Sequence, residues 1–169
     1  MKKAKKLLVS MFMFMAMLFI FTYSEPVEAA TKKLADAKYL DGKSVANEDS
    51  IITPTGKSYT KNVVKFDASL DAWASYDLAK KYDVFKGVFV TSASTGSGNF
   101  EITFYGDGKQ LKTYKGITNS NQNIKFSINV KGIKTLKIES NNIGSWGNGF
   151  VYIANGVFEN SNTNPKTIT

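Results

Sequence analysis

The chain has 169 residues and a formal net charge of +8. It contains no Cys, no His and no Arg, so all 22 basic residues are Lys. Without Cys there can be no disulfide scaffold, thiolate metal site or Cys nucleophile. Without His the chain lacks the usual general base and the commonest metal ligand. The absence of the guanidinium group argues against nucleic-acid recognition and phosphoryl transfer, which normally use bidentate Arg contacts.

The N-terminal segment has the pattern of a secretory signal peptide. Four Lys within the first six residues precede an apolar run of 15 residues, Leu7 to Phe21. Val27 and Ala29 fit the small-residue cleavage pattern, so we expect cleavage after Ala29, with Ala30 as the neighbouring option. The alternative is an uncleaved membrane anchor, but the run is shorter than the roughly 18–20 residues that span a bilayer. We therefore expect a secreted protein with no stable membrane insertion after cleavage.

The remainder fits one domain. About 140 mature residues can bury roughly two thirds of their unfolded surface in a single core. We predict a signal peptide at 1–29, one domain at 30–160 and a polar tail at 161–169. Cleavage removes four Lys and two Glu and leaves a net charge of +6. This charge indicates a solvated Lys surface or a weak attraction to anionic cell-wall polymers.

The clearest predicted element is a β-hairpin. Apolar and polar residues alternate through 99–105, and an Asp-Gly pair at 107–108 supplies a two-residue turn. With this turn, Phe104 should pair with Leu111 on the apolar face of the hairpin.

Most other segments also read as strands. Segments 123–130 and 134–140 alternate with a period of two, and a helical turn is suggested only at 78–83. Residues Leu34 to Ser58 should carry one or two edge strands. Two segments, 83–90 and 149–158, have apolar residues at both odd and even positions, so both faces should be covered and the segments should be central strands. The predicted fold class is all-β, a two-sheet antiparallel sandwich.

The segment 71–78, "DAWASYDL", places its tryptophan on the polar side of a strand. As a strand it would put Trp73 with Ser75 and Asp77 on one face and the smaller and apolar residues on the other. Trp73 then either packs beneath the N-terminal segment or is available to contact an external ligand. We expect partial exposure near a loop.

The order of these segments resembles the NPCBM family of carbohydrate-binding modules. The resemblance runs from Leu34 to Glu159, and it rests on "SYDL" followed by "YDVFKG", "YGDGKQL", "INVKGIKTLKI" and "YIANGVFE". It implies a galactose-binding-like jelly-roll sandwich and a carbohydrate ligand. The chain departs from the family at 152–155, where many members have Trp-Ala-Asp/Asn, and at Val63, where Gly is usual. Because the last-strand change bears on the binding edge, no sugar preference carries over.

Aromatic rings and fixed amides are what a sugar site needs, because rings cover the C–H face of a sugar and amides replace its water hydrogen bonds. The candidate carbohydrate-binding residues are Trp73, Trp146, Asn142 and Asn148, the last three in a Gly/Asn/Ser-rich stretch at 140–150. The alternative for Trp146 is a plug that closes the end of the sandwich. Tyr105 and Tyr114, expected on the outward face of the hairpin, form a third candidate platform.

Catalysis and metal binding are weakly indicated. A hydrolase without His or Cys would need paired carboxylates. The outward candidates are Asp77, Glu101 and Glu139, and alternation with Lys on a solvated face explains each of them. "GDGK" lacks the further acidic ligands of a calcium loop. We predict no enzyme activity, no cofactor and no metal, although a structural Ca²⁺ held by backbone carbonyls would leave no sequence mark.

Two functions remain open. The leading hypothesis is a secreted, non-catalytic module that binds cell-wall or extracellular glycan. The alternative is a secreted structural or interaction protein that attaches through its Lys-rich surface to an anionic polymer or a protein partner. Charge attachment should weaken as ionic strength rises, whereas stacking on a neutral sugar should not.

Overall fold

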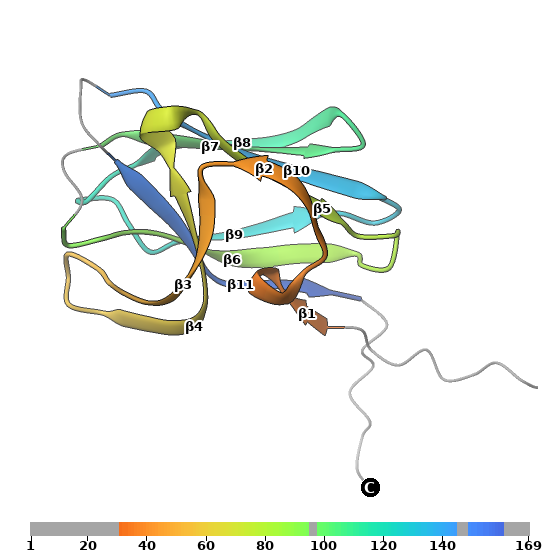
Figure 1. The fold of residues 1–169 in the computed structure, drawn as a ribbon, viewed down its shortest axis with the longest axis horizontal. Coiled ribbons are helices and arrows are strands. Elements are labelled where there is room, and N and C mark those ends of the chain that lie inside the picture. The colour runs from red at the N-terminus through yellow and green to blue at the C-terminus, as the bar shows by residue number, and fades with distance from the viewer. Residues whose placement is uncertain (1–30, 95–97, 145–148, 161–169) are drawn as a thin grey trace, which may run out of the picture.

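The computed structural model describes residues 31–94, 98–144 and 149–160, which form a sandwich of two antiparallel β-sheets (Figure 1). The elements are β1 (Thr31–Lys33), η1 (Leu34–Asp36), β2 (Tyr39–Lys43), β3 (Val45–Ile52), β4 (Ser58–Asp67), η2 (Ala68–Leu70), β5 (Ala72–Asp77), β6 (Val84–Thr91), β7 (Phe100–Gly106), β8 (Lys109–Ile117), β9 (Ile124–Asn129), β10 (Thr135–Asn142) and β11 (Phe150–Glu159), where η marks a 3-10 helix. Among these elements no helix is long and apolar enough to cross a membrane. The predicted signal peptide and polar tail lie outside the described residues.

The strand order explains the two open sides of the sandwich. Sheet A has the order β3-β4-β11-β6-β9, with β1 paired to β11, and sheet B has the order β2-β5-β10-β7-β8. Strands β2 and β3 therefore lie at one open side, which faces the viewer in Figure 1, and β8 and β9 lie at the other. The predicted two-sheet antiparallel sandwich is confirmed. So are the edge strands expected between Leu34 and Ser58, and the central strands expected at 83–90 and 149–158.

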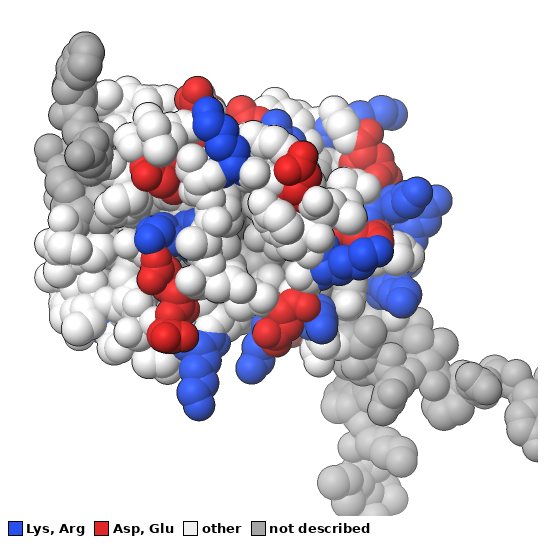
Figure 2. Space-filling model, in the orientation of Figure 1, with Lys and Arg blue, Asp and Glu red and all other residues white. Residues whose placement is uncertain are grey.

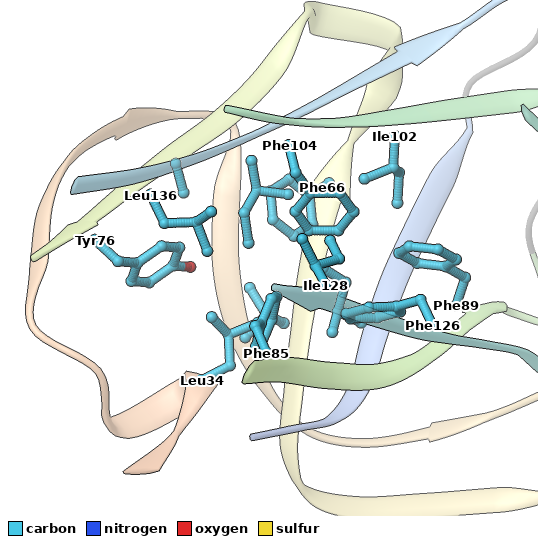
Figure 3. Close-up of a cluster of buried hydrophobic side chains, with 14 of the residues drawn as sticks. Leu34, Phe66, Tyr76, Phe85, Phe89, Ile102, Phe104, Phe126, Ile128 and Leu136 are labelled. Carbon is cyan, nitrogen blue, oxygen red and sulfur yellow. The ribbon is translucent and has the colours of Figure 1, made fainter. Parts of the chain in front are cut away.

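The core is formed by the inward faces of both sheets (Figure 3). The Phe89 ring stacks on Phe126 with centroids 4.4 Å apart, and the Phe104 ring lies 5.4 Å from Phe126. Each fully buried Phe contributes about 1.5–3 kcal/mol relative to an exposed one. In β5, buried and partly exposed residues alternate as predicted, so Tyr76 enters the core and Trp73 does not.

A second apolar cluster lies on the outer face of sheet A. It contains Tyr59, Val63, Val90 and Tyr152, all buried. The Tyr59 hydroxyl donates to Asn123 Oδ1 at 2.8 Å, which joins β4 to the segment before β9 on the far edge of the sheet. Strands β6 and β11 are thus covered on both faces, which accounts for their apolar residues at both parities.

The β7–β8 hairpin has the predicted turn but a different register. Asp107 and Gly108 have φ of 47° and 80°, the signs that a two-residue hairpin turn of this type requires. A bulge after Gln110 then adds one residue, so Phe104 pairs with Lys112 and not with Leu111.

The same extra residue corrects the prediction for Tyr114. Because side chains alternate with a period of two, one added residue moves every later side chain to the other face. Tyr114 therefore packs against the core, 5.1 Å from the Phe89 ring centroid, and is not part of an outward platform.

The helical turn suggested at 78–83 is wrong. Ala79 and Lys80 have φ of 47° and 61°, outside the helical region, and Lys81 N–H donates to the Leu78 carbonyl at 2.9 Å. The segment is a tight turn between β5 and β6, whose geometry the sequence "LAKKYD" does not reveal.

Candidate functional site

Trp73 lies on the outer face of sheet B and is partly exposed, as the sequence predicts. It is the second residue of β5, so it stands next to the turn that follows η2. Its neighbours across the sheet are Lys43 on β2 and Glu139 on β10. The flat face of an indole beside a carboxylate and an ammonium group is a suitable surface for a polar ligand with an apolar side.

A second partly exposed ring lies on the same face. Tyr105 on β7 is opposite Lys137 on β10, and the Lys137 ammonium lies 5.0 Å from the Trp73 ring centroid and 5.7 Å from that of Tyr105. Lys137 also donates to Glu139 Oε2 at 2.8 Å. The ammonium group thus bridges the space between the two rings and is held by a carboxylate and two ring faces.

The register arranges this outer face in rows. One row across sheet B contains Lys43, Trp73, Glu139, Thr103 and Thr113, and the next contains Asp41, Ser75, Lys137, Tyr105 and Gln110. The two rings are two strands and two residues apart, about 12 Å from Cα to Cα at ordinary sheet spacings. A ligand that contacts both rings would also contact Lys137, which lies between them. We name this surface, centred on Trp73, Tyr105 and Lys137, the outer face of sheet B.

Hydroxyl and amide groups border the two rings. Thr103 Oγ1 and Thr113 Oγ1 share a hydrogen bond of 2.9 Å, and Gln110 Nε2 donates to Thr113 Oγ1 at 3.3 Å. Groups held in this way can exchange hydrogen bonds with sugar hydroxyls without first losing much conformational freedom.

Asn142 holds two loops together. It is the last residue of β10, and its Oδ1 accepts the backbone N–H of Asn99 at 3.3 Å and of Gly144 at 3.0 Å. The Ile143 N–H donates to the Asn99 carbonyl at 2.8 Å, so the loops after β6 and after β10 are joined there. This gives Asn142 a structural role that the sequence did not indicate.

The other predicted site residues are placed only in part. Trp146 and Asn148 lie outside the described residues. Trp73 pairs with Glu139 of β10. Glu139 lies three residues before Asn142, which corresponds to about 10 Å along the strand. The structure therefore brings Trp73 and Asn142 to the same end of sheet B, which we call the loop end.

The three candidate carboxylates each contact a lysine. Asp77 pairs with Lys38, Glu101 with Lys115 and Glu139 with Lys137, at N–O distances of 2.9, 2.6 and 2.8 Å. No cluster of three His, Cys, Asp or Glu side chains that could hold a metal occurs in the described part of the chain.

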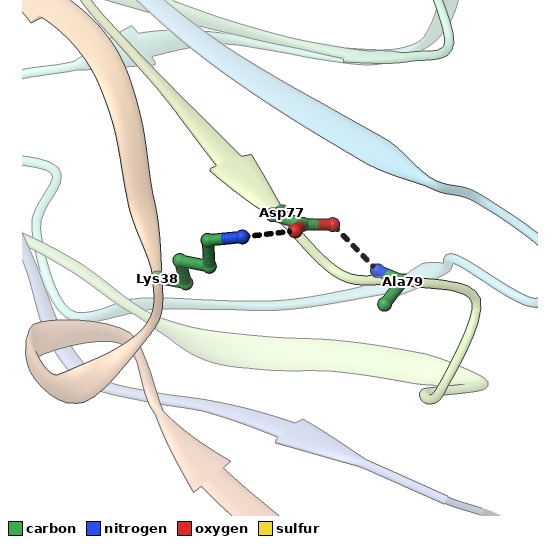
Figure 4. A network of polar contacts seen from close by, with 3 residues as sticks. All are labelled: Lys38, Asp77 and Ala79. Atoms are coloured by element: carbon green, nitrogen blue, oxygen red, sulfur yellow. Dashed lines mark hydrogen bonds and ion pairs between the residues drawn. The ribbon is translucent and has the colours of Figure 1, made fainter.

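Asp77 has a structural role at the end of β5 (Figure 4). The hydrogen bond from Lys38 and the backbone N–H of Ala79 lower the pKa of its carboxyl below the usual range. A carboxylate held in its charged form by such partners is a poor proton donor at neutral pH, because a general acid needs a raised pKa.

Lys137 is the residue that sequence reasoning missed. The alternation of residues along β10 places Lys137 on the outer face of the sheet. Its position between Trp73 and Tyr105, however, depends on β10 pairing with both β5 and β7. These strands are far apart in the sequence, so only the strand order could have revealed the contact.

Comparison with known proteins agrees with this architecture. The family model described as NPCBM/NEW2 domain matches residues 27–153. A search of curated protein sequences gave no match.

Several solved carbohydrate-binding modules have a similar fold. The second CBM51 module of Clostridium perfringens ZmpB, solved with its INT domains and GlcNAc, aligns with a TM-score of 0.63 at 15% identity over 78% of this chain. The tandem CBM51 modules of a family 98 glycoside hydrolase from Streptococcus pneumoniae align at 0.62 and 17% over 77% of this chain. The chain spans 32% and 47% of the lengths of those two chains.

A third structure matches over nearly its whole length. The CBM51 module of Clostridium perfringens GH95, in complex with methyl-galactose, aligns with a TM-score of 0.61 at 12% identity over 76% of this chain and 99% of that chain. At these identities the likeness establishes the fold.

Proposed function

Because the chain belongs to the NPCBM/NEW2 domain family and has the fold of a carbohydrate-binding module, we propose that it is an exported protein that binds a glycan without transforming it. The observation that carries the proposal is the pair of partly exposed rings, Trp73 and Tyr105, on the outer face of sheet B. The ligand is a neutral or weakly charged oligosaccharide chain, held by stacking and hydrogen bonds.

The physical argument concerns what a sugar loses when it leaves water. Its hydroxyl groups need new hydrogen-bond partners, and its C–H face gains from an apolar ring. The outer face of sheet B supplies both, since the partly exposed Thr113 and the exposed Gln110 lie near Tyr105, and Glu139 lies beside Trp73.

Binding without catalysis is supported by the state of the carboxylates. Glu101 and Glu139 lie on neighbouring strands of an open sheet face, and each is paired with a lysine. A glycosidase would require one of its two carboxyl groups to stay protonated as an acid, in a cleft that excludes water.

The test is a glycan array probed with residues 30–169, which contain both sheets. Galactose- and GlcNAc-terminated glycans belong on it, because the similar modules were solved with methyl-galactose and GlcNAc. Binding is measured at low and at physiological salt for the wild type, Trp73→Thr, Tyr105→Thr and Trp146→Ala. Threonine keeps the strand propensity of the two sheet positions.

The matched control is Ile52→Ala, which removes an exposed apolar side chain, 59% accessible, from sheet A. We expect particular glycans to bind equally at both salt concentrations, with Trp73→Thr at least about tenfold weaker, a loss of about 1.4 kcal/mol, and Ile52→Ala unchanged. Binding that disappears at physiological salt and ignores the ring substitutions would overturn the proposal and favour charge attachment.

A further inference from the structure

The two edge strands at one open side of the sandwich contain lysines and no acidic residues. Between Asp107 and Glu139 the sequence contains seven Lys and no Asp or Glu. This stretch forms β8 and β9, the edge strands of the two sheets at one open side, and the start of β10. By contrast, Figure 2 shows Lys and Asp or Glu side chains interspersed on the opposite side, around β2 and β3.

A groove lies between these two edge strands. It has a volume of about 400 Å³, and Leu111 and Lys112 of β8 line it together with Ser127 and Asn129 of β9 and with Lys131. Among the described residues neither edge strand has a further strand beside it, so the groove is bordered by the open edges of both sheets. It lies three strands away from Trp73 across sheet B, on the edge strand that also carries Gln110 and Thr113.

The two lysines of the groove differ from others nearby. Lys115 and Lys137 are neutralised by Glu101 and Glu139. Lys112 lies opposite Phe104 of β7, and Lys131 follows Val130, whose N–H donates to the Asp83 carbonyl at 2.8 Å. The nearest acidic residue in sequence, Asp107, directs its carboxylate to the backbone N–H groups of Lys134 and Thr135.

The groove is held in shape by local contacts. The Lys112 ammonium lies 4.7 Å from the Tyr114 ring centroid, and Tyr114 is fixed against the core. Asn129 Oδ1 accepts the backbone N–H of Lys131 at 2.9 Å, which fixes the turn that carries the second lysine. Two cations on opposite edges, with a hydroxyl and an amide between them, fit a chain that carries both anionic groups and hydroxyl groups.

We propose that this groove binds a segment of an anionic polysaccharide. Lys112 and Lys131 contact its carboxylate or phosphate groups, Ser127 and Asn129 bind its hydroxyl groups, and the side chain of Leu111 packs against a sugar ring. Nucleic acid is the disfavoured polyanion, because the chain has no Arg for base or phosphate recognition and no aromatic side chain lines the groove.

The test uses residues 30–169 and four immobilised polymers. These are polygalacturonate for the carboxylate arm, poly(glycerol phosphate) for the phosphate arm, neutral dextran, and single-stranded DNA at matched charge density. Dissociation constants are measured by biolayer interferometry at about 20 mM and 150 mM salt. The variants are Lys112→Gln/Lys131→Gln and, as the control with the same change in net charge, Lys33→Gln/Lys57→Gln on β1 and before β4. Thermal unfolding verifies that all variants fold.

We expect at least one anionic polysaccharide to bind more tightly than dextran and DNA. The groove variant should lose about tenfold in affinity, because two ion pairs with the polymer are lost, and the control less than about twofold. Binding to polygalacturonate would identify the anionic group as a carboxylate, and binding to poly(glycerol phosphate) would identify it as a phosphate. Equal losses in both double variants, DNA binding as tight as polysaccharide binding, or no binding to either anionic polysaccharide would overturn the proposal. None of these outcomes depends on Trp73, so this proposal and the glycan-binding proposal can fail separately.

Discussion

Asn62 of β4 connects η1 in the N-terminal segment to β11. It is buried with φ of 132°, its Oδ1 accepts the Ala35 N–H at 3.2 Å, and its Nδ2 donates to the Gly156 carbonyl at 2.9 Å. The structure explains why an amide suits this position: one side chain both donates and accepts.

Replacing Asn62 with Ala should therefore lower the free energy of unfolding by about 3 kcal/mol, because the buried Gly156 carbonyl and the partly buried Ala35 N–H lose their partner. Urea unfolding measures this. Asn47→Ala is the control, since the Asn47 amide also bonds the backbone of Ala35, at 3.1 Å, but is exposed. It should cost less than about 1 kcal/mol. Equal losses of unfolding free energy in Asn62→Ala and Asn47→Ala would contradict the stabilising role assigned to the buried Asn62 amide.

Asp107 makes the stability of the fold depend on pH in acid. The backbone N–H groups of Thr135 and Lys134 lower the pKa of its carboxyl. A pKa that is lower in the folded state than in the unfolded state means that the charged form favours folding. The contribution is therefore present above about pH 4, the usual Asp pKa, and is lost as the pH falls through the folded value.

Asp107→Asn should accordingly make the fall in Tm between about pH 4 and pH 2 shallower than in the wild type, because one titrating group is removed. Asparagine also tolerates the positive φ of this turn position. Asp77 titrates in the same direction, so part of the fall should remain. Asp49→Asn, an exposed residue of β3, is the control. If the Tm of Asp107→Asn falls between about pH 4 and pH 2 as steeply as that of the wild type, the contribution of Asp107 to acid sensitivity is contradicted.

At the scale of elements, the bulge after Gln110 determines which face of β8 meets the core. Deleting Thr113 should keep the bulge, place Tyr114 opposite Thr103 and so move its ring outward, away from Phe89 and Phe104. We expect a loss of about 3 kcal/mol or more in unfolding free energy, the usual cost of removing a large aromatic from a core.

Deleting Leu111 is the matched control, because it removes the bulged residue itself and leaves Tyr114 opposite Ile102. It should cost about 1 kcal/mol, since Leu111 is only partly buried. If deleting Thr113 is no more harmful than deleting Leu111, the bulge does not set the register.

Prediction from the sequence succeeded where the signal was local. Alternation of apolar and polar residues identified β5, β7, β9 and β10, and Asp-Gly identified the hairpin turn. The bulge after Gln110 leaves no mark in the sequence, so the outward position expected for Tyr114 was wrong.

The candidate site, too, could be predicted only where the sequence signal was local. The outward parity of Trp73 followed from the alternation within β5, whereas the contacts of Lys137 with Trp73 and Tyr105 depend on pairing between strands distant in the chain. Asn142 was chosen for its residue type and its loop, and neither revealed that its Oδ1 joins two loops.

At the scale of the whole molecule, the ends of the described chain and the loop end lie apart. Thr31 pairs with Glu159, so both chain ends are at the same end of the sandwich (Figure 1). Strand β11 runs from Phe150 near the loop end to Glu159, which places the chain ends opposite the loops. The loop end carries the exposed apolar side chains of Leu70 and Ile143. A tether at either chain terminus would leave this end and Trp73 accessible.

The central claim, that ring stacking holds a glycan, can be tested most directly through the indole N–H signals. The chain has only 2 Trp, at 73 and 146, so a ¹⁵N-labelled sample gives two such signals, which Trp73→Thr assigns. Titration with a glycan that binds on the array should shift the Trp73 signal at physiological salt, in proportion to the bound fraction. Saturating binding that moves neither indole signal would contradict the account.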